Sequence, residues 1–246
     1  MNTALYEARR AWQWIVDGFA LFMKAPVMWM ALTVVMALVW LVSFLIPALG
    51  PLLFNLLSPV VFAGLMLGCR TLERGGRLEP GHLLAGFQTN TGALVAVGGV
   101  YLVGSLVILG VVWTIAGGSV LQTLLQKGAA AVHSIPGAAR SMGFAMLVGF
   151  LLYLPLLMVV WFAPILIAFH GMTPVAAMKR SLAACLVTWL AFLVYGAILL
   201  LLFIAAVPLL VGLLVLLPVI FCSIYASYKD IFAIADVPEP PAGPTA

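Results

Sequence analysis

Four long stretches of the chain contain no charged side chain. They are bounded by the pairs Lys24 and Arg70, Glu79 and Lys127, Arg140 and Lys179, and Arg180 and Lys229. Each stretch is longer than the roughly 20 apolar residues that cross about 30 Å of hydrocarbon as a helix. Hydrocarbon offers no hydrogen-bond partner to backbone groups, so a crossing segment must satisfy them within a helix or a closed barrel. Since the alternating pattern of a membrane β-barrel is absent, the sequence predicts an all-α membrane protein.

The composition indicates which partners such a chain has. Only 7% of its residues are charged, whereas a soluble domain carries about 25%. Lipid must therefore cover much of the surface, and the lipid bilayer is the first expected partner. Membrane protein partners or a homo-oligomer are further possibilities. The net charge of +4 comes from basic residues beside the apolar runs, where they meet lipid phosphates, so nucleic acid is not expected.

Helix breakers divide the apolar runs into six expected spans arranged as three hairpins. Pro47, Gly50 and Pro51 form one turn, and the final run is too long for one crossing and breaks near Pro208. At both turns, a re-entrant hairpin is the alternative to two full crossings. The fourth span is longer than the bilayer requires, which predicts tilt, a kink or an end outside the lipid. The expected spans are about residues 27–46, 52–69, 93–116, 142–169, 189–207 and 208–226, within a polytopic membrane domain of residues 25–232.

The two ends of the chain differ from this domain. Residues 1–24 carry Trp12, Ile15 and Phe19 on one side of a helix and charged residues on the other, which predicts a cytoplasmic amphipathic helix lying in the interface. Residues 233–246 are rich in proline and are expected to be a disordered cytoplasmic tail. A segment with an apolar helical face precedes a hairpin three times. This indicates a threefold repeat, with chance similarity among Leu- and Val-rich helices as the alternative.

Basic residues predict the orientation. With six spans, one side receives nine Lys and Arg residues, and the other receives only Lys127 and Arg140. Such an asymmetry marks the first side as cytoplasmic, so both termini are expected in the cytoplasm. Five spans would instead place Lys229 outside. The nine residues are Arg9, Arg10, Lys24, Arg70, Arg74, Arg77, Lys179, Arg180 and Lys229.

The expected spans lack the side chains that carry out chemistry in membranes. No Asp, Glu, Lys or Arg lies within them, which removes the usual parts of proton relays and aspartyl intramembrane proteases. His82, His133 and His170 fall beside the spans, where bonds to backbone or water explain them and a metal site would need convergence from separate loops. We therefore assign no catalytic, cofactor-binding or metal-binding residue and expect no cofactor.

The remaining polar and aromatic residues have structural explanations. Serine and asparagine side chains in the spans, at Ser43, Asn55 and Ser58, are expected to bond the backbone one turn earlier or to join helices, with a substrate path as the alternative. Cysteines are widely spaced and are expected to be buried and reduced. Tryptophans are expected to form an aromatic belt at the interfaces, with a lipid-headgroup site as the alternative. The cysteines are Cys69, Cys185 and Cys222, and the tryptophans expected in the belt are five of the seven, Trp12, Trp14, Trp29, Trp161 and Trp189.

Several segments together resemble a known family. They are Ala11-Trp12-Gln13-Trp14, the Pro47 and Gly50-Pro51 turn, Trp161-Phe162-Ala163-Pro164 before His170-Gly171, and Ser227-Tyr228-Lys229-Asp230-Ile231-Phe232. Over nearly the whole chain except its tail, the sequence resembles an uncharacterised bacterial family of six-span integral membrane proteins. It is distantly similar to the membrane domain attached to some glycerophosphodiester phosphodiesterases, whose catalytic domain has no counterpart in this sequence. The resemblance implies a bacterial cell inner membrane location and supplies no catalytic residues.

These observations lead to three hypotheses for function. The first is a non-enzymatic accessory or envelope-organising component that binds lipid or a membrane partner. The alternative is a transporter or channel for an apolar or zwitterionic solute, because proline-broken helices often line substrate sites. An intramembrane enzyme that uses a serine or His170 comes third.

Overall fold

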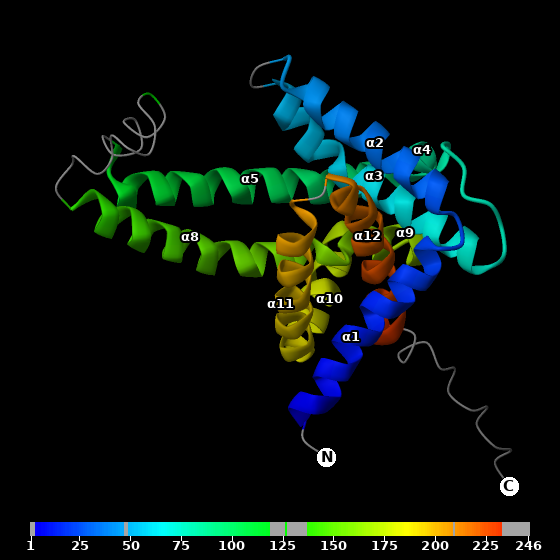
Figure 1. The fold of residues 1–246 in the computed structure, drawn as a ribbon. Coiled ribbons are helices and arrows are strands. Elements are labelled where there is room, and N and C mark those ends of the chain that lie inside the picture. Colours follow the sequence, from blue (N-terminus) through cyan, green and yellow to red (C-terminus); the bar gives the residue numbers. More distant parts are fainter. Residues whose placement is uncertain (1–2, 47–48, 119–125, 127–136, 209, 233–246) are drawn as a thin grey trace, which may run out of the picture.

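The computed structural model describes residues 3–46, 49–118, 126, 137–208 and 210–232, and these form helices without a β-strand (Figure 1). Pro47, Lys127, His133 and the tail of residues 233–246, for which the sequence made predictions, lie outside the described residues. In chain order the helices are α1 (Thr3–Phe22), α2 (Pro26–Ser43), α3 (Leu49–Glu73), α4 (His82–Ala85), the 3₁₀ helix η1 (Gly86–Gln88), α5 (Thr91–Ala116), α8 (Ala138–Trp161), α9 (Ala163–His170), α10 (Pro174–Val187), α11 (Trp189–Ala206) and α12 (Leu210–Phe232).

Six segments of the described chain are long and apolar enough to cross a membrane. Five of them lie in the single helices α2, α3, α5, α11 and α12, and the sixth joins α8 to α9. The prediction of an all-α membrane protein with six spans is therefore confirmed. The helices extend beyond some of the expected spans. For example, α3 continues through Arg70 to Glu73 and stops just before Gly75, whose φ of 82° lies in the left-handed region that favours glycine.

The spans pair as three hairpins, α2 with α3, α5 with α8, and α11 with α12. A further helical segment precedes each hairpin, and these segments are α1, α4 with η1, and α10. The element order therefore repeats three times, in agreement with the sequence pattern. Figure 1 shows α5 and α8 running side by side as a long hairpin, and its far end is joined by a hydrogen bond of 3.1 Å from Ser141 Oγ to the Ala116 carbonyl.

The main core surrounds α9 and the parts of α3 and α12 that pack near it. Ile165 and Leu166 of α9 and Val60 of α3 are fully buried. The neighbouring helix α5 approaches α3 closely at Gly98, where an added Cβ would lie 2.1 Å from the Leu56 carbonyl oxygen. A side chain at position 98 would therefore push the two spans apart.

The fourth span is interrupted at Phe162, between α8 and α9. In a regular helix the Phe162 N–H would donate to the Met158 carbonyl. Instead the Ser181 hydroxyl of α10 lies between them, accepting from Phe162 N at 3.0 Å and donating to the Met158 oxygen at 2.7 Å. A side chain inserted into the backbone ladder is a known cause of kinks, and Pro164 in the first turn of α9 lacks the N–H that would continue the ladder. The expected kink in the long span is thus a break stabilised by Ser181.

Two tryptophans correct the prediction of an aromatic belt. Trp14 and Trp29 are only 2% and 1% exposed, so they lie in the protein interior. Trp14 is held there because its indole N–H donates to the Asp230 carboxylate at 2.8 Å, which allows the large ring to pack between helices. Trp12 and Trp189 remain exposed, as residues of an interfacial belt must be.

Candidate functional site

The first and last helices of the chain are joined at Asp230. Its Oδ2 accepts from Arg10 Nε at 2.8 Å and from Trp14 Nε1 at 2.8 Å. The Arg10 guanidinium also contacts Glu7 at 3.4 Å and lies 5.8 Å from the centre of the Trp14 ring. One carboxylate near the end of α12 therefore fixes both a cation and an aromatic ring of α1, and charge-assisted hydrogen bonds of this kind are among the stronger ones.

Farther along, α1 crosses α12 at Gly18. An added Cβ there would lie 2.6 Å from the Ser223 backbone nitrogen, so the two backbones touch. The Ser223 hydroxyl also shares a 2.5 Å hydrogen bond with the Tyr195 hydroxyl of α11. On the α11 side, Ala11, Trp14 and Tyr195 belong to one buried cluster. Helix α1 is thus seated against α11 and α12, and it does not stand apart from the helical bundle.

A second polar contact joins α3 to α12. Glu73 accepts a 2.7 Å hydrogen bond from the Tyr225 hydroxyl and forms an ion pair with Lys229. Lys24, just after α1, donates to the Leu72 carbonyl at 3.3 Å. These groups line a polar hollow of about 510 Å³ between α1, α3 and α12. Its lining holds three acidic side chains, Asp17, Glu73 and Asp230, and two basic ones, Lys24 and Lys229, and of the three acids Asp230 is also paired with Arg10.

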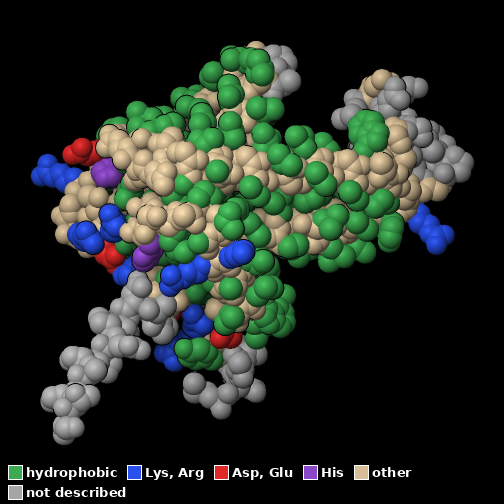
Figure 2. Space-filling view, turned by 180° about the vertical axis from the view of Figure 1, so that it is seen from behind, with side chains coloured by type: hydrophobic (Ala, Val, Ile, Leu, Met, Phe, Trp, Pro, Cys, Tyr) green, Lys and Arg blue, Asp and Glu red, His purple; other side chains and the backbone are tan. Residues whose placement is uncertain are grey.

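Cations and aromatic rings continue around the same end of the molecule. The Arg70 guanidinium lies 4.4 Å from the centre of the Phe169 ring, and that of Arg180 lies 5.6 Å from the centre of the Phe232 ring. His170 Nε2 is 2.6 Å from the hydroxyl of Tyr228, also on α12. Figure 2 shows Lys and Arg side chains gathered at this end. Segments far apart in sequence therefore place their basic residues together.

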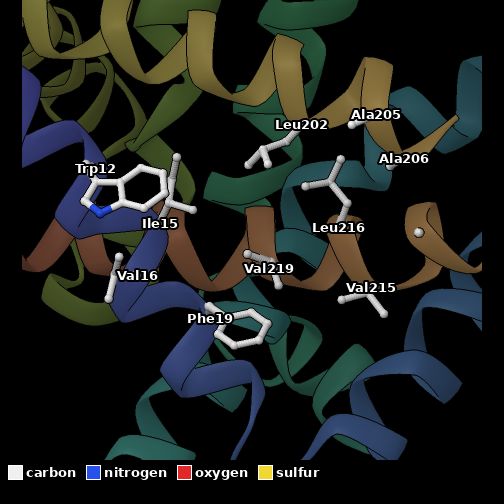
Figure 3. A pocket seen from close by; sticks show the side chains of 11 residues that line it. Trp12, Ile15, Val16, Phe19, Leu202, Ala205, Ala206, Val215, Leu216 and Val219 are labelled. Atoms are coloured by element: carbon white, nitrogen blue, oxygen red, sulfur yellow. The ribbon is translucent and has the colours of Figure 1, made fainter.

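An apolar groove lies beside this polar network. It has a volume of about 840 Å³, within the roughly 300–1,000 Å³ typical of ligand pockets. Helices α1, α11 and α12 form its walls (Figure 3). None of the described lining residues is polar; they are Trp12, Ile15, Val16, Phe19, Leu202, Ala205, Ala206, Gly212, Val215, Leu216 and Val219.

The polar side chains singled out from the sequence bond locally. Ser43 donates to the Trp40 carbonyl, Asn55 to the Pro51 carbonyl and Ser58 to the Asn55 carbonyl, each within three or four residues. The prediction of bonds to the preceding turn is confirmed for all three residues. The alternative of a substrate path along these side chains stays a prediction.

The two histidines that the structure describes, His82 and His170, are also engaged within the protein. His82 Nδ1 accepts from the Glu79 backbone nitrogen at 3.0 Å, and its Nε2 lies 3.3 Å from the Thr71 hydroxyl. In the part of the chain that the structure describes, no three His, Cys, Asp or Glu side chains stand close enough to hold a metal ion. The three cysteines are buried and free, as expected.

The apolar groove is suited to holding an apolar molecule. The ion pairs of Asp230 and Glu73 lie beside it.

Sequence reasoning did not find the Asp230 contact, the groove or the role of Ser181. Asp230 stood out only within the motif of the family resemblance, and its partner Arg10 is 220 residues away. The small residues at Ala205, Ala206 and Gly212 gave a signal that the ends of α11 and α12 leave room between them. Nothing in the local sequence indicated that α1 would lie across that space.

The six spans and the absence of strands in the described residues define a polytopic all-α membrane protein. A Burkholderia thailandensis protein described as a "probable inner membrane protein" is 30% identical to the chain over 260 residues, with 95% of this chain and 94% of that protein covered. The chain belongs to the family of that inner membrane protein. No protein-family model matches the chain, and no solved structure matches it. The likeness to the membrane domain of glycerophosphodiester phosphodiesterases stays an expectation.

Proposed function

We propose that this chain is a non-enzymatic protein of the bacterial inner membrane that binds a membrane lipid and serves as an accessory or envelope-organising component. The observation that carries the proposal is the apolar groove between α1, α11 and α12. Two of its walls are membrane-spanning segments, so hydrocarbon chains are the molecules that surround it. A membrane protein partner is the other ligand that such a surface could accept.

The proposed absence of enzymatic activity is supported by the chemistry around the groove. Its lining offers no acid, base or nucleophile. The charged side chains that join α1 to α12, Arg10 and Asp230, are engaged with each other. They hold α1 in place, which is a structural role.

We further propose that both termini face the cytoplasm. All nine basic residues assigned to that side are described. Arg10, Lys24, Arg70, Arg180 and Lys229 take part in the contacts around the ends of α3 and α12. Their clustering at one end supports a positive-inside orientation.

The lipid-binding proposal is tested by purifying the protein from native membranes in a mild detergent and measuring its intact mass by native mass spectrometry. Retention of phospholipid after detergent exchange is the expected result. Protein that emerges wholly free of lipid under these conditions contradicts the proposal.

The orientation is tested separately with reporters fused to the C-terminus. Green fluorescent protein, which matures in the cytoplasm, is expected to fluoresce, and alkaline phosphatase, which needs the periplasm, is expected to be inactive. The opposite pair of results contradicts the orientation and leaves the lipid-binding proposal untouched.

A further inference from the structure

We infer that the groove between α1, α11 and α12 holds one acyl chain of a phospholipid, with the lipid phosphate at Arg9. This inference rests on the proposed lipid-binding function and adds to it the class of lipid, the position of its chain and the residue that contacts its headgroup.

The groove is wedge-shaped because α1 and α11 meet at one end and then separate. They are packed together where Ala11 and Trp14 contact Tyr195. Beyond that point α11 lines the groove only with Leu202, Ala205 and Ala206. Figure 3 shows α1 turning away from α11 while α12 passes between them as the floor.

The lining gives the length of the groove. It runs from Trp12 to Phe19 on α1 and from Gly212 to Val219 on α12, and seven residues of helix rise roughly 10 Å at 1.5 Å per residue. The groove therefore contacts part of one extended acyl chain, and the small residues Ala205, Ala206 and Gly212 leave room at its wide end.

Hydrophobicity alone does not select this occupant, because lipid tails are as apolar as leucine side chains. Selection must come from contact along the groove and from the headgroup. Arg9 precedes Trp12 by three residues and Val16 by seven, so it lies on the same face of α1 as the groove lining. It is exposed, and among the described residues it enters no salt bridge, whereas the adjacent Arg10 is paired with Asp230.

An unpaired guanidinium beside an interfacial tryptophan is suited to a phosphodiester. The guanidinium presents parallel donors that match two phosphate oxygens. Trp12 is 53% exposed and lines the groove, so its ring lies between the headgroup level and the chain below it. One phospholipid therefore places its phosphate at Arg9 and its acyl chain in the groove from Trp12 inward.

Two pairs of variants test the inference in the full-length protein. Ala206→Phe fills the groove, and Ala197→Phe adds the same ring to an exposed position of α11 that does not line it. Arg9→Gln removes the phosphate contact, and Arg74→Gln removes an exposed charge after α3. Delipidated protein in detergent is titrated with dioleoylphosphatidylglycerol or with dioleoylglycerol, which has the same chains without a phosphate. Bound lipid is counted by native mass spectrometry.

Ala206→Phe is expected to abolish retention of phosphatidylglycerol, and Arg9→Gln is expected to weaken it about tenfold, the effect of losing one charge-assisted hydrogen bond. Dioleoylglycerol is expected to bind the wild type and Arg9→Gln equally weakly. Both control variants are expected to bind like the wild type.

Three results overturn the inference. If Ala206→Phe retains phosphatidylglycerol like the wild type, the lipid binds elsewhere, while the proposed lipid-binding function stands. If Arg9→Gln retains it like the wild type, the phosphate is not at Arg9. If the wild type is a dimer by light scattering and Ala206→Phe is a monomer, a second copy of the chain occupies the groove.

Discussion

Replacing Ser181 with alanine tests how the broken fourth span is held. The hydroxyl accepts from Phe162 N–H and donates to the Met158 carbonyl, and Ser181 and Phe162 are both 0% exposed. Ser181→Ala leaves both backbone groups without that partner. A buried group left unsatisfied costs about 1–3 kcal/mol. The Met158 oxygen keeps a weak contact with the Cys185 thiol at 3.8 Å, so a total loss of about 2–3 kcal/mol is expected.

Thermal unfolding in detergent measures this loss through the cysteines. All three are buried, so a thiol-reactive dye reports unfolding. At about 2–4 °C per kcal/mol for a chain of this size, the Tm of Ser181→Ala is expected to fall by about 4–12 °C. Ser58→Ala is the matched control, because its hydroxyl bonds only the Asn55 carbonyl of the same helix and its loss should move Tm by less than about 2 °C.

Equal Tm values for Ser181→Ala and the control would refute the reasoning, because Phe162 N–H would then have bonded Met158 directly and closed the helix. Pro164 is the reason to expect otherwise, since a proline in the first turn of α9 opposes a continuous ladder. The double variant Ser181→Ala with Pro164→Ala should therefore regain part of the lost stability. A double variant no more stable than Ser181→Ala contradicts this assignment of the proline.

Two further predictions concern the seating of α1 on α12. Gly18→Ala places a Cβ 2.6 Å from the Ser223 nitrogen and should lower the free energy of unfolding by about 1–3 kcal/mol. Gly110→Ala is the control, because a Cβ there meets nothing within 4 Å, and it should leave Tm unchanged or raise it. Equal losses of stability in both variants would mean that the close crossing of α1 and α12 is not the cause. Asp230→Asn removes the ion pair with Arg10 and, because the aspartate side chain is 36% exposed, should cost no more than about 1 kcal/mol. It should also speed hydrogen exchange in α1, and exchange in α1 at the wild-type rate would count against an anchoring role for Asp230.

The sequence predicted what depends on local composition. Uncharged runs longer than a bilayer locate the spans, and prolines locate the hairpin turns, because hydrocarbon imposes helix on any crossing segment. The burial of Trp14 could not be predicted in this way. Its helical face is set by spacing, but its partner Asp230 lies at the other end of the chain, and only folding brings the two together.

The groove and the break in the fourth span both depend on contacts between separate helices. The length of the fourth span predicted a tilt, a kink or an end outside the lipid, but the hydroxyl that bonds the Met158 carbonyl comes from Ser181 on α10. The groove was not predicted, because its third wall comes from α1, which is far from α11 and α12 in the sequence.

The ion pair between Arg10 and Asp230 has a consequence for biosynthesis. The two residues are separated by 220 positions, and a ribosome that adds roughly 5–20 residues per second needs about 10–45 s to travel from one to the other. During that time α1 has been made but its seat on α12 has not. Helix α1 thus leaves the ribosome well before it can dock on α12, and a membrane surface that covers its apolar side in the meantime would act as its temporary partner.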